Sequence, residues 1–411
     1  MNRYWSLRRR VAYSVVPESG GLFRFYKNLR KALADYGWDV RAVCAGSMAA
    51  ARWDHSFADA GCHLIAEDTR QKIGAAMALA QWIEQNQINI LIPMDDRVAG
   101  SCVPHLPASI RLVTRCSSAT AFAYRISAIY PQRLAGTVVN TPRQKQGLLA
   151  QGIPETKIAF IPHGVDTGLF SLKTREKEVG IDPVRVTYIG RLVHETKGIL
   201  LLPLIAEQLK ATGVLFSMDV FGDGPDRRRL EKLIEKVQVS EHVRLHGTVT
   251  DDVLVRRLPD FDCLLMPSFV EGFSFALLEA MSAGVIPLVS HLPNVTDFVI
   301  NHGENGFLCE VDNVAAFVES ILLLHADRLR QIKMAHNARK TIEDRFSLDR
   351  MGADYNHFLN AILRSSPTES LPLAWSAFTI HPAYRGSMLS RMPRPVVSVV
   401  KRLLNHRAIL R

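Results

Sequence analysis

The sequence has few of the features that mark membrane-spanning or disulfide-bonded proteins. No apolar run approaches the ~20 residues that a membrane-spanning helix needs, and Val11–Val16 is too short for a signal-peptide core. The six cysteines are scattered, with no C-x-x-C pair, which predicts reduced core thiols rather than disulfides or a zinc site. We therefore expect a cytoplasmic protein. The cysteines are Cys44, Cys62, Cys102, Cys116, Cys263 and Cys309.

Acidic residues are in the minority, with 40 Asp and Glu against 50 Lys and Arg. Residues 1–10 contain four Arg and no acid, and residues 365–411 contain seven basic residues and one acid, Glu369. These ends account for the whole net charge of +10, so residues 11–364 are formally neutral. A nucleic-acid-binding protein usually spreads its basic residues over a folded face. The distribution therefore predicts no nucleic-acid partner.

The pattern that is present alternates short apolar strands with amphipathic helices. With 411 residues, 47% of them apolar, the chain is long enough for two domains. The alternation predicts an α/β fold of doubly wound parallel sheets with helices on both faces. Ligands of such sheets gather at the carboxyl ends of the strands. The expected strands are Val11–Val16, Val40–Cys44, Ile88–Pro93, Ile110–Val113, Gly136–Val139, Ile158–Ile161, Val184–Ile189, Leu215–Phe221, Val243–Leu245, Cys263–Met266 and Val285–Val289.

The clearest helical period lies in Leu22–Tyr36. Its apolar positions, spaced by three and four residues, predict one buried face. Gly37 ends this helix, and the joint between the two halves is expected within 164–183. The apolar positions are Leu22, Phe25, Leu29, Leu33 and Tyr36.

The most informative stretch is Pro267–Gly284, in which an apolar strand runs through a Glu-Gly turn into a helix. Such a junction points free backbone N–H groups and a positive helix dipole at whatever lies above it, which suits a diphosphate. Glu271 and Glu279 bracket the helix start, and an ionised carboxylate accepts hydrogen bonds from neighbouring hydroxyls. A diphosphate with vicinal hydroxyls describes a nucleotide sugar. Gly284 stands where a helix ends in a left-handed residue.

The spacing Glu271-x7-Glu279, with Gly-Phe-Ser-Phe after the first Glu and Glu-Ala-Met-x-x-Gly around the second, resembles a known motif. It is similar to the EX7E motif of retaining GT-B glycosyltransferases of the GT4-like type (family 4, group 1). The alternative is an ordinary amphipathic helix with two surface glutamates. The resemblance covers most of residues 10–364, strongly after Asn140. It implies two Rossmann-like domains facing a cleft.

The resemblance also implies a division of the chain. The expected parts are an acceptor-binding domain at 1–168, a nucleotide-sugar donor domain at 169–347, a helix crossing back at 348–364, and a basic tail at 365–411.

Gly190–Gly198 follows a strand and places Arg191 and Lys197 at its carboxyl end. As a sugar leaves a nucleoside diphosphate, the departing oxygen gains negative charge, which two fixed cations stabilise most in the transition state. The segment resembles the G-R-L…K-G element of the same family, where Arg and Lys hold the diphosphate. The alternative is a pair of solvated surface cations.

Three loops give weaker signals. Gly222, in Phe221–Asp226, resembles an element that helps shape the nucleotide pocket in relatives, but Gly-Asp-Gly-Pro fits a plain turn equally well. The His246–Val249 loop resembles one that frames the base in relatives, and neither loop identifies the base. Gly21 closes the sequence Glu18-Ser-Gly-Gly between the first strand and the first helix. Two glycines let backbone amides approach a phosphate or sugar closely, and a simple strand-helix turn explains them nearly as well.

The first half departs from the family at one point. Many relatives have a His-Asp or similar pair near the acceptor, but Leu112–Ser118 contains no histidine, and neither Arg115 nor Ser117 takes a role from the sequence. His163 occupies a position where relatives often have Asn. Asp95, with Asp96, follows a strand end and is a candidate acceptor contact. No suitably spaced ligand joins this pair, so it predicts no metal site.

The resemblance implies a metal-independent, retaining hexosyltransferase without a resident cofactor, which moves a sugar from a nucleotide sugar to a hydroxyl. Catalysis would fall to Glu271, Arg191 and Lys197. The expected donor-binding residues are Gly21, Gly190, Gly222, Gly272, Phe273, Ser274, Phe275 and Glu279. The main alternative is a non-catalytic GT-B subunit that binds a nucleotide sugar or glycan. An epimerase is not supported, because the first half shows no carboxylate-histidine set for acid-base chemistry, and a phosphorylase would normally have a cofactor lysine and a much longer chain.

The tail suggests where the reaction takes place. Val396–Arg411 is a basic amphipathic segment, which either lies on an anionic membrane surface, packs on the first domain or is disordered. With the basic residues 1–10 it favours a peripheral position at the inner face of the membrane. The expected acceptor is a glycan or a lipid-linked oligosaccharide of a cell-surface polysaccharide or glycolipid.

Overall fold

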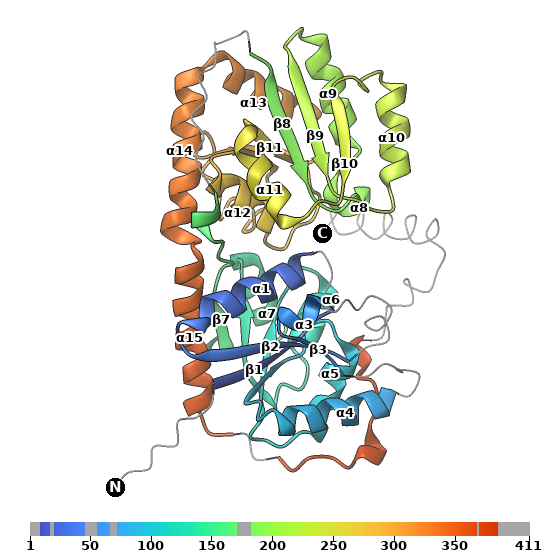
Figure 1. The fold of residues 1–411 in the computed structure, drawn as a ribbon, viewed down its shortest axis with the longest axis vertical. Coiled ribbons are helices and arrows are strands. Elements are labelled where there is room, and N and C mark those ends of the chain that lie inside the picture. Colours follow the sequence, from blue (N-terminus) through green and yellow to red (C-terminus); the bar gives the residue numbers. More distant parts are fainter. Residues whose placement is uncertain are drawn as a thin grey trace.

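Two parallel sheets organise the chain, one in each half of the molecule (Figure 1). The computed structural model describes residues 9–16, 20–45, 56–65, 72–170, 182–367 and 370–384. Within these residues no helix combines the length and apolarity needed to cross a bilayer. All six cysteines are buried free thiols, as expected.

The first sheet has seven parallel strands in the order β3-β2-β1-β4-β5-β6-β7. The strand order reverses between β1 and β4, where a doubly wound sheet opens a ligand site at its carboxyl edge. The strands are β1 (Arg9–Ser14), β2 (Trp38–Cys44), β3 (Cys62–Leu64), β4 (Ile90–Ile92), β5 (Arg111–Arg115), β6 (Leu134–Val139) and β7 (Ile158–Phe160). The helices are α1 (Gly21–Ala34), α3 (Ser56–Asp59), α4 (Lys72–Gln85), α5 (Arg97–Cys102), α6 (Ala121–Ser127) and α7 (Pro142–Ala150), with short 3-10 turns at Val103–His105, Glu155–Lys157 and Thr167–Leu169.

The second sheet has six parallel strands in the order β10-β9-β8-β11-β12-β13, and its order reverses between β8 and β11. The strands are β8 (Val184–Ile189), β9 (Phe216–Phe221), β10 (Val243–Gly247), β11 (Cys263–Met266), β12 (Ile286–Ser290) and β13 (Phe307–Cys309). The helices are α8 (His194–Lys197), α9 (Leu201–Ala211), α10 (Arg227–Lys236), α11 (Asp251–Arg257), α12 (Phe275–Ser282), α13 (Val314–Ala326) and α14 (Arg328–Arg345), with a 3-10 turn at Leu258–Asp260.

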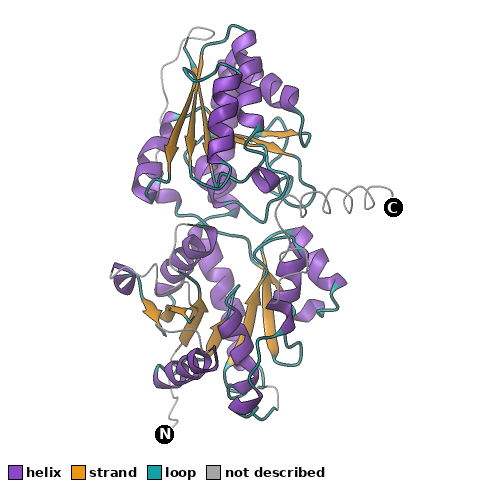
Figure 2. Cartoon of the chain, turned by 90° about the vertical axis from the view of Figure 1, so that its right-hand side faces the viewer, coloured by secondary structure: helices purple, strands orange, loops and turns teal. Residues whose placement is uncertain are grey.

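Alternation along the strands explains why helices cover both faces of each sheet (Figure 2). In β11, Leu264 and Met266 join one apolar cluster, while Cys263 and Leu265 join another on the opposite face. Successive side chains of a strand point to opposite faces, so a strand buried on both faces is apolar throughout. This is why continuous apolar runs predicted the strands.

The structure confirms the α/β class and all eleven expected strands, with ends that differ by a few residues. It adds β3 and β13, whose three residues are too short to show a period. The prediction for one position of the first helix was wrong. Tyr36 lies beyond the end of α1 and is exposed, because the helix stops at Ala34, whereas Phe25, Leu29 and Leu33 are buried as expected. Gly284 has the expected positive φ of 75° after α12.

Several expectations fall outside the described residues. These are the Glu18-Ser19 part of the first glycine loop, the arginines of residues 1–8, the charged run Lys173–Glu178, Glu369, and the tail from Arg385 to Arg411 with its basic amphipathic segment.

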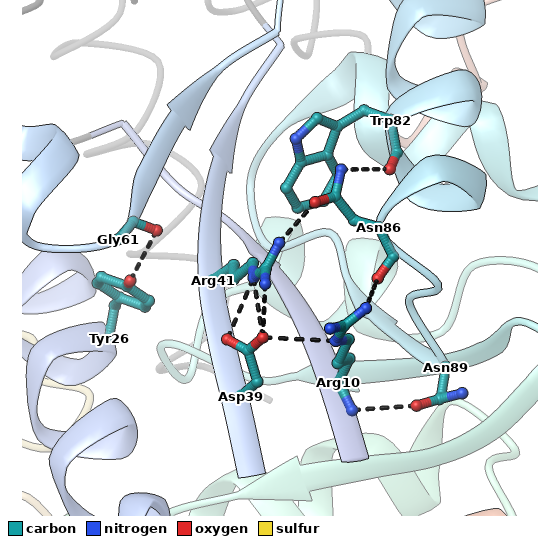
Figure 3. A network of polar contacts seen from close by, with 8 residues as sticks. All are labelled: Arg10, Tyr26, Asp39, Arg41, Gly61, Trp82, Asn86 and Asn89. Atoms are coloured by element: carbon teal, nitrogen blue, oxygen red, sulfur yellow. Dashed lines mark hydrogen bonds and ion pairs between the residues drawn. The ribbon is translucent and has the colours of Figure 1, made fainter. Parts of the chain in front are cut away.

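A polar network ties the amino ends of β1 and β2 to the end of α4 (Figure 3). Asp39 accepts from Arg41 at 2.7 Å and pairs with Arg10 at 3.5 Å. Both arginines reach Asn86, and the backbone N–H of Arg10 donates to Asn89 Oδ1 at 3.0 Å. The network provides hydrogen-bond partners for polar groups at the amino ends of the strands. This edge of the sheet therefore contributes to the stability of the fold.

After α14 the chain returns along the first half as α15 (Leu348–Arg364), which packs against α1 (Figure 1). Residues 370–384, the C-terminal strap, then lie across α5 and the turn that follows it. Trp375 stacks on His105 with ring centres 4.8 Å apart, and Tyr384 fills the space beside Gly100. The described part of the tail thus packs on the first half of the molecule.

Candidate functional site

The loops after β8 and β11 lie together because these strands are neighbours at the point where the strand order reverses. The backbone N–H groups of Phe269 and Val270 donate to Thr196 O at 2.9 and 3.1 Å. Gly198 ends α8 with φ +62°, and a side chain there would overlap Pro267 O. Only a glycine allows this approach of two backbones. The local fold thus fixes the position of Lys197, the last residue of α8.

Lys197 and Glu271 form a close ion pair, with 2.6 Å between Nζ and Oε1. Ser268 Oγ donates to the same oxygen at 2.7 Å. The Glu271 side chain is only 6% exposed, whereas Lys197 is 28% exposed. The structure therefore brings together two of the three predicted catalytic residues, and the lysine reaches solvent while the carboxylate is held beneath it.

Glu279, the second carboxylate of the motif, pairs with a cation from the other half of the molecule. Arg24, in the first turns of α1, donates through Nη1 to Glu279 Oε1 and through Nη2 to Asp251. Lys27 also pairs with Asp251. Burial raises the pKa of Glu279 to about 7, against the lowering effect of Arg24.

Both carboxylates keep one oxygen for a ligand. In each glutamate the paired cation binds Oε1, and in Glu271 the hydroxyl of Ser268 binds the same oxygen. Within the described part of the chain, Oε2 of each has no hydrogen-bond partner. Neither Oε2 atom is among the polar side-chain atoms of the described core that are shut off from solvent and have no hydrogen-bond partner. An oxygen in this state accepts a hydroxyl group.

The start of α12 exposes its backbone rather than its side chains. Ser274 is the N-cap and accepts from Leu277 N at 3.4 Å. The rings of Phe273 and Phe275 are buried against His163, with Phe275 stacked at 4.4 Å. Phe273 and Phe275 therefore have only main-chain groups to offer a ligand, whereas Ser274 also keeps its hydroxyl proton.

Arg191 lies in the loop directly after β8 and is exposed. Among the described residues its guanidinium forms no ion pair or hydrogen bond, while its carbonyl accepts from Tyr188 Oη at 3.1 Å and from Val193 N at 2.9 Å. The structure thus places Arg191 near the end of the strand that leads to Lys197, but does not bring it onto Glu271.

The predicted glycines fall into two groups. No described atom lies within 4 Å of where a Cβ of Gly21 would be, so the space above it is open to a ligand. Gly190 and Gly222 instead pack on each other, because a Cβ on Gly222 would overlap Gly190 O. A Cβ on Gly272 would stand 2.5 Å from Ser117 O in the loop after β5. For Gly222 and Gly272, backbone packing is itself a sufficient reason, whereas a Cβ on Gly190 would stand 2.9 Å from the Tyr188 hydroxyl.

A buried cation lies between the two halves. Arg115, 5% exposed, donates through Nη2 to His163 Nε2 at 3.2 Å and covers the ring of Phe25 at 3.9 Å. Burial and the nearby Arg115 lower the pKa of His163 well below 6.5, so the imidazole is neutral and accepts this hydrogen bond. Arg115 Nε and Nη1 have no partner in the described structure. His163 therefore links the sheet of the first half to the start of α12.

Asp95 lies at the carboxyl edge of the first sheet, where its strand order reverses. The register of β4 on β5 pairs Ile90 with Arg111, which sets Asp95 near the level of Arg115. The surrounding protein partly removes water from the Asp95 carboxyl and raises its pKa, whereas Arg115 lowers it, although the residue as a whole stays exposed. Asp96 instead caps α5 and accepts from Ser14 Oγ at 2.7 Å. The two neighbouring acids thus differ, since Asp96 has a structural role and Asp95 is exposed.

No group of three or more metal-ligating side chains occurs in the part of the chain that the structure describes.

The sequence did not single out Arg24, Ser268 or the Arg115–His163 contact. A signal for Arg24 existed, since Arg24, Lys27, Asn28 and Lys31 are spaced as one face of a helix, opposite its apolar face. Nothing in that spacing names the partner, which lies 255 residues away along the chain.

Comparison with known proteins adds family information. Residues 173–341 match the family model described as "Glycosyl transferases group 1", and residues 19–169 match "Glycosyltransferase Family 4". The WcaL protein of Escherichia coli (strain K12), named for colanic acid biosynthesis, is 30% identical over 52% of this chain and 54% of its own. The amylovoran biosynthesis glycosyltransferase AmsK of Erwinia amylovora is 28% identical over 49% of this chain and 50% of its own. The chain spans about half the length of these relatives.

Solved structures match over a larger share. Sucrose-phosphate synthase from Thermosynechococcus elongatus has a TM-score of 0.72 at 17% identity, covering 87% of this chain and 100% of its own. Anabaena HepE in complex with UDP-glucose has a TM-score of 0.71 at 15% identity, covering 86% and 99%. At these identities the likeness shows the fold, and it confirms the expected arrangement of two Rossmann-like domains.

Proposed function

Because the chain belongs to the GT4-like glycosyltransferases (family 4, group 1) with the GT-B fold, we propose that it transfers a sugar from a nucleoside diphosphate to a hydroxyl acceptor with retention of configuration. The observation that carries this proposal is the Lys197–Glu271 pair at 2.6 Å, on the loops that follow β8 and β11. These loops meet at the strand-order reversal of the second sheet, where doubly wound sheets bind nucleotides.

Lys197 and Arg191 would hold the leaving diphosphate. The bond between the sugar and the diphosphate breaks with a gain of negative charge on the departing oxygen, and positioned cations stabilise that charge more in the transition state than in the ground state. The backbone N–H groups at the start of α12 and the helix dipole would assist. These cations would supply the charge that Mg²⁺ brings to other phosphate sites, so we propose a metal-independent reaction.

The two carboxylates would divide the donor between them. Glu271 would accept hydroxyls of the transferred sugar through Oε2, since Oε1 is engaged by Lys197 and Ser268. Glu279 would accept the ribose hydroxyls in the same way. The acceptor hydroxyl would attack from the face of the leaving group, so that the leaving phosphate takes its proton. This route needs no histidine beside the acceptor, in keeping with Leu112–Ser118.

The acceptor would bind the first domain, proposed as 1–168, opposite a donor domain at 169–347. Asp95 is our candidate acceptor contact, because it is exposed at the carboxyl edge of the first sheet. Relatives named for colanic acid and amylovoran biosynthesis support a glycan acceptor, free or lipid-linked, in cell-surface polysaccharide or glycolipid synthesis. A structural neighbour in complex with UDP-glucose supports a nucleotide-sugar donor.

Slow hydrolysis of UDP-, GDP-, ADP- and dTDP-sugars by the wild type, by Lys197→Ala and by Glu271→Gln tests the proposal. Release of one nucleoside diphosphate by the wild type alone, with the sugar of an α-linked donor released first as its α anomer, is the expected result. Saturable donor binding without turnover, even with candidate acceptors, would favour the non-catalytic GT-B subunit instead.

A position at the inner face of the membrane would follow from the basic termini, whose basic residues, apart from Arg9 and Arg10, lie outside the described residues. Sedimentation with vesicles of phosphatidylcholine and phosphatidylglycerol, but not with phosphatidylcholine alone, is expected. A chain ending at Tyr384 should lose this binding, and binding that is equal for both vesicles and both chains would contradict the proposal.

A further inference from the structure

One face of α1 consists of four polar residues, Arg24, Lys27, Asn28 and Lys31. Their spacing of three and four residues puts them on one side of the helix. In Figure 1, α1 lies at the boundary with the second domain, below α11 and α12. All four side chains contact that domain or the joint. Arg24 pairs with Glu279 and Asp251, Lys27 with Asp251, and Lys31 with Asp166, while Asn28 Nδ2 donates to Gly164 O at 2.9 Å.

Arg24 differs from the other three because it alone reaches a buried carboxylate. Glu279 is 7% exposed, whereas Asp251 is 48% and Asp166 25% exposed. The planar guanidinium is shared, with Nη1 on Glu279 and Nη2 on Asp251. Two anchors on one rigid fork fix its orientation, and therefore that of the Glu279 carboxylate.

We infer that Arg24 is a positioning residue for nucleotide recognition, which holds Oε1 of Glu279 so that Oε2 faces the ribose hydroxyls. The ribose site of the second domain is then complete only when α1 of the first domain is docked against it. This inference rests on the proposed function.

Electrostatics supports the same role. The charged groups around Glu279 are Arg24 and Lys27 of α1 and Asp251 of α11. Burial raises the pKa of Glu279 to about 7 even though both cations lower it and only Asp251 adds to the rise. Without Arg24 the carboxyl would take up a proton at neutral pH. A protonated carboxyl has fewer acceptor sites, so the ribose would lose its partner.

Calorimetric titration of UDP, GDP and ADP, each beside its 2′-deoxy counterpart, tests the role of Arg24. For the nucleotide that binds the wild type most tightly, Arg24→Gln is expected to lower the affinity on the order of tenfold. The 2′-deoxy counterpart should change much less, because it lacks one of the two hydroxyls. The loss should grow from pH 8.5 to pH 6.5, since the variant keeps Glu279 protonated to a higher pH. Arg24→Lys should recover part of the affinity, and Lys31→Gln, on the same helix face, should match the wild type.

The outcomes separate this inference from the function on which it rests. An unchanged ribonucleotide affinity in Arg24→Gln, or an equal loss for both nucleotides, would overturn the inference and leave the proposed function standing. Failure of the wild type to bind UDP, GDP, ADP or dTDP would overturn both, whereas binding of dTDP alone would overturn the inference and leave the proposed function standing. If thermal unfolding shows that Arg24→Gln does not fold, the same titrations on Arg24→Lys decide. There a ribose-specific loss supports the role and any other pattern overturns it.

Discussion

The two glutamates of the motif are both buried, but their cations come from different places. Glu271 pairs with Lys197 of its own domain, 74 residues away in sequence, whereas Glu279 pairs with Arg24 of the other domain, 255 residues away. Glu271 also has Ser268 within hydrogen-bonding distance at 2.7 Å. Glu279 instead shares its cation with Asp251.

This difference separates the two ends of the proposed donor site. The sugar end is built by two loops of one sheet, so it persists as long as the second domain is folded. The ribose end depends on how the two domains are docked. A change in domain position would therefore alter nucleotide recognition before it altered the groups around the sugar.

Removal of Lys197, the cation that pairs with Glu271 inside the second domain, should have the largest effect on activity. Lys197→Ala should lower the turnover of donor hydrolysis roughly 100- to 1000-fold, because a positioned charge at the leaving group is lost. Nucleotide affinity should change much less. Comparison of the loss of turnover with the loss of nucleotide affinity in each variant separates the sugar end from the ribose end. An equal fall in turnover in Arg24→Gln would contradict the distinction between the two ends.

The sugar end also contacts the first domain at Gly272. A methyl group there would stand 2.5 Å from Ser117 O, which is backbone and must move. We expect Gly272→Ala to cost about 1–3 kcal/mol of unfolding free energy, as other overpacked contacts do. Thermal unfolding measures it, with Gly74→Ala in α4 as the control, since no described atom lies within 4 Å of that added methyl. Equal unfolding temperatures for the two variants would show that the contact yields easily.

Neutralising the carboxylate at the ribose end should affect binding rather than chemistry. Glu279→Gln should weaken nucleoside diphosphate binding on the order of tenfold, because a charged acceptor becomes a neutral one. Calorimetry at pH 8, where Glu279 is mostly ionised, measures the loss. The exposed Glu241→Gln serves as the control, and a similar loss there would rule out a specific role.

The raised pKa of Glu279 predicts opposite effects of pH on binding and stability. Because the folded pKa of about 7 exceeds the ordinary 4.5, the folded state binds an extra proton between these values. The contribution of this group to the free energy of unfolding therefore falls as pH rises through the window, by at most about 1.4 kcal/mol per unit. Nucleotide affinity should instead rise with pH. Urea unfolding and calorimetry at pH 6 and 8 measure both, and Glu279→Gln should flatten the difference. Parallel trends in the wild type would contradict the assignment.

The second domain could be predicted well because its signals are local. The strand, turn and helix around Glu271 are consecutive in sequence, and so are the strand and loop that carry Lys197. A site built from two such junctions can be predicted with the single rule that adjacent parallel strands end at the same edge of the sheet. The sequence therefore predicted that Lys197 and Glu271 belong to one site, although not that they form an ion pair or that Ser268 donates to the same carboxylate.

Contacts between the domains could not be predicted, because they depend on docking. Arg24 has the spacing of an ordinary solvated helix face. Gly272 lies in a turn that was predicted to bind the donor, and the sequence does not show that it also packs against Ser117 O. The sequence assigned Arg115 no role, yet it is buried and hydrogen-bonded to His163. The contacts of Arg24 and Gly272 need the relative position of two folded units, whereas the Arg115–His163 contact needs the packing of distant segments within the first half. No local pattern contains either.

The exposed end of the α1 face should contribute least. Lys31 is 63% exposed and pairs with Asp166 at the joint, where solvent and salt screen the attraction. We expect Lys31→Gln to change the unfolding free energy by less than about 1 kcal/mol, and less still at 0.5 M NaCl. Urea unfolding at low and high salt, beside Arg24→Gln, measures the contrast. If Lys31→Gln proved as costly as Arg24→Gln, the whole face would act as one interdomain clamp, and the special position of the buried carboxylate would no longer explain the docking of α1.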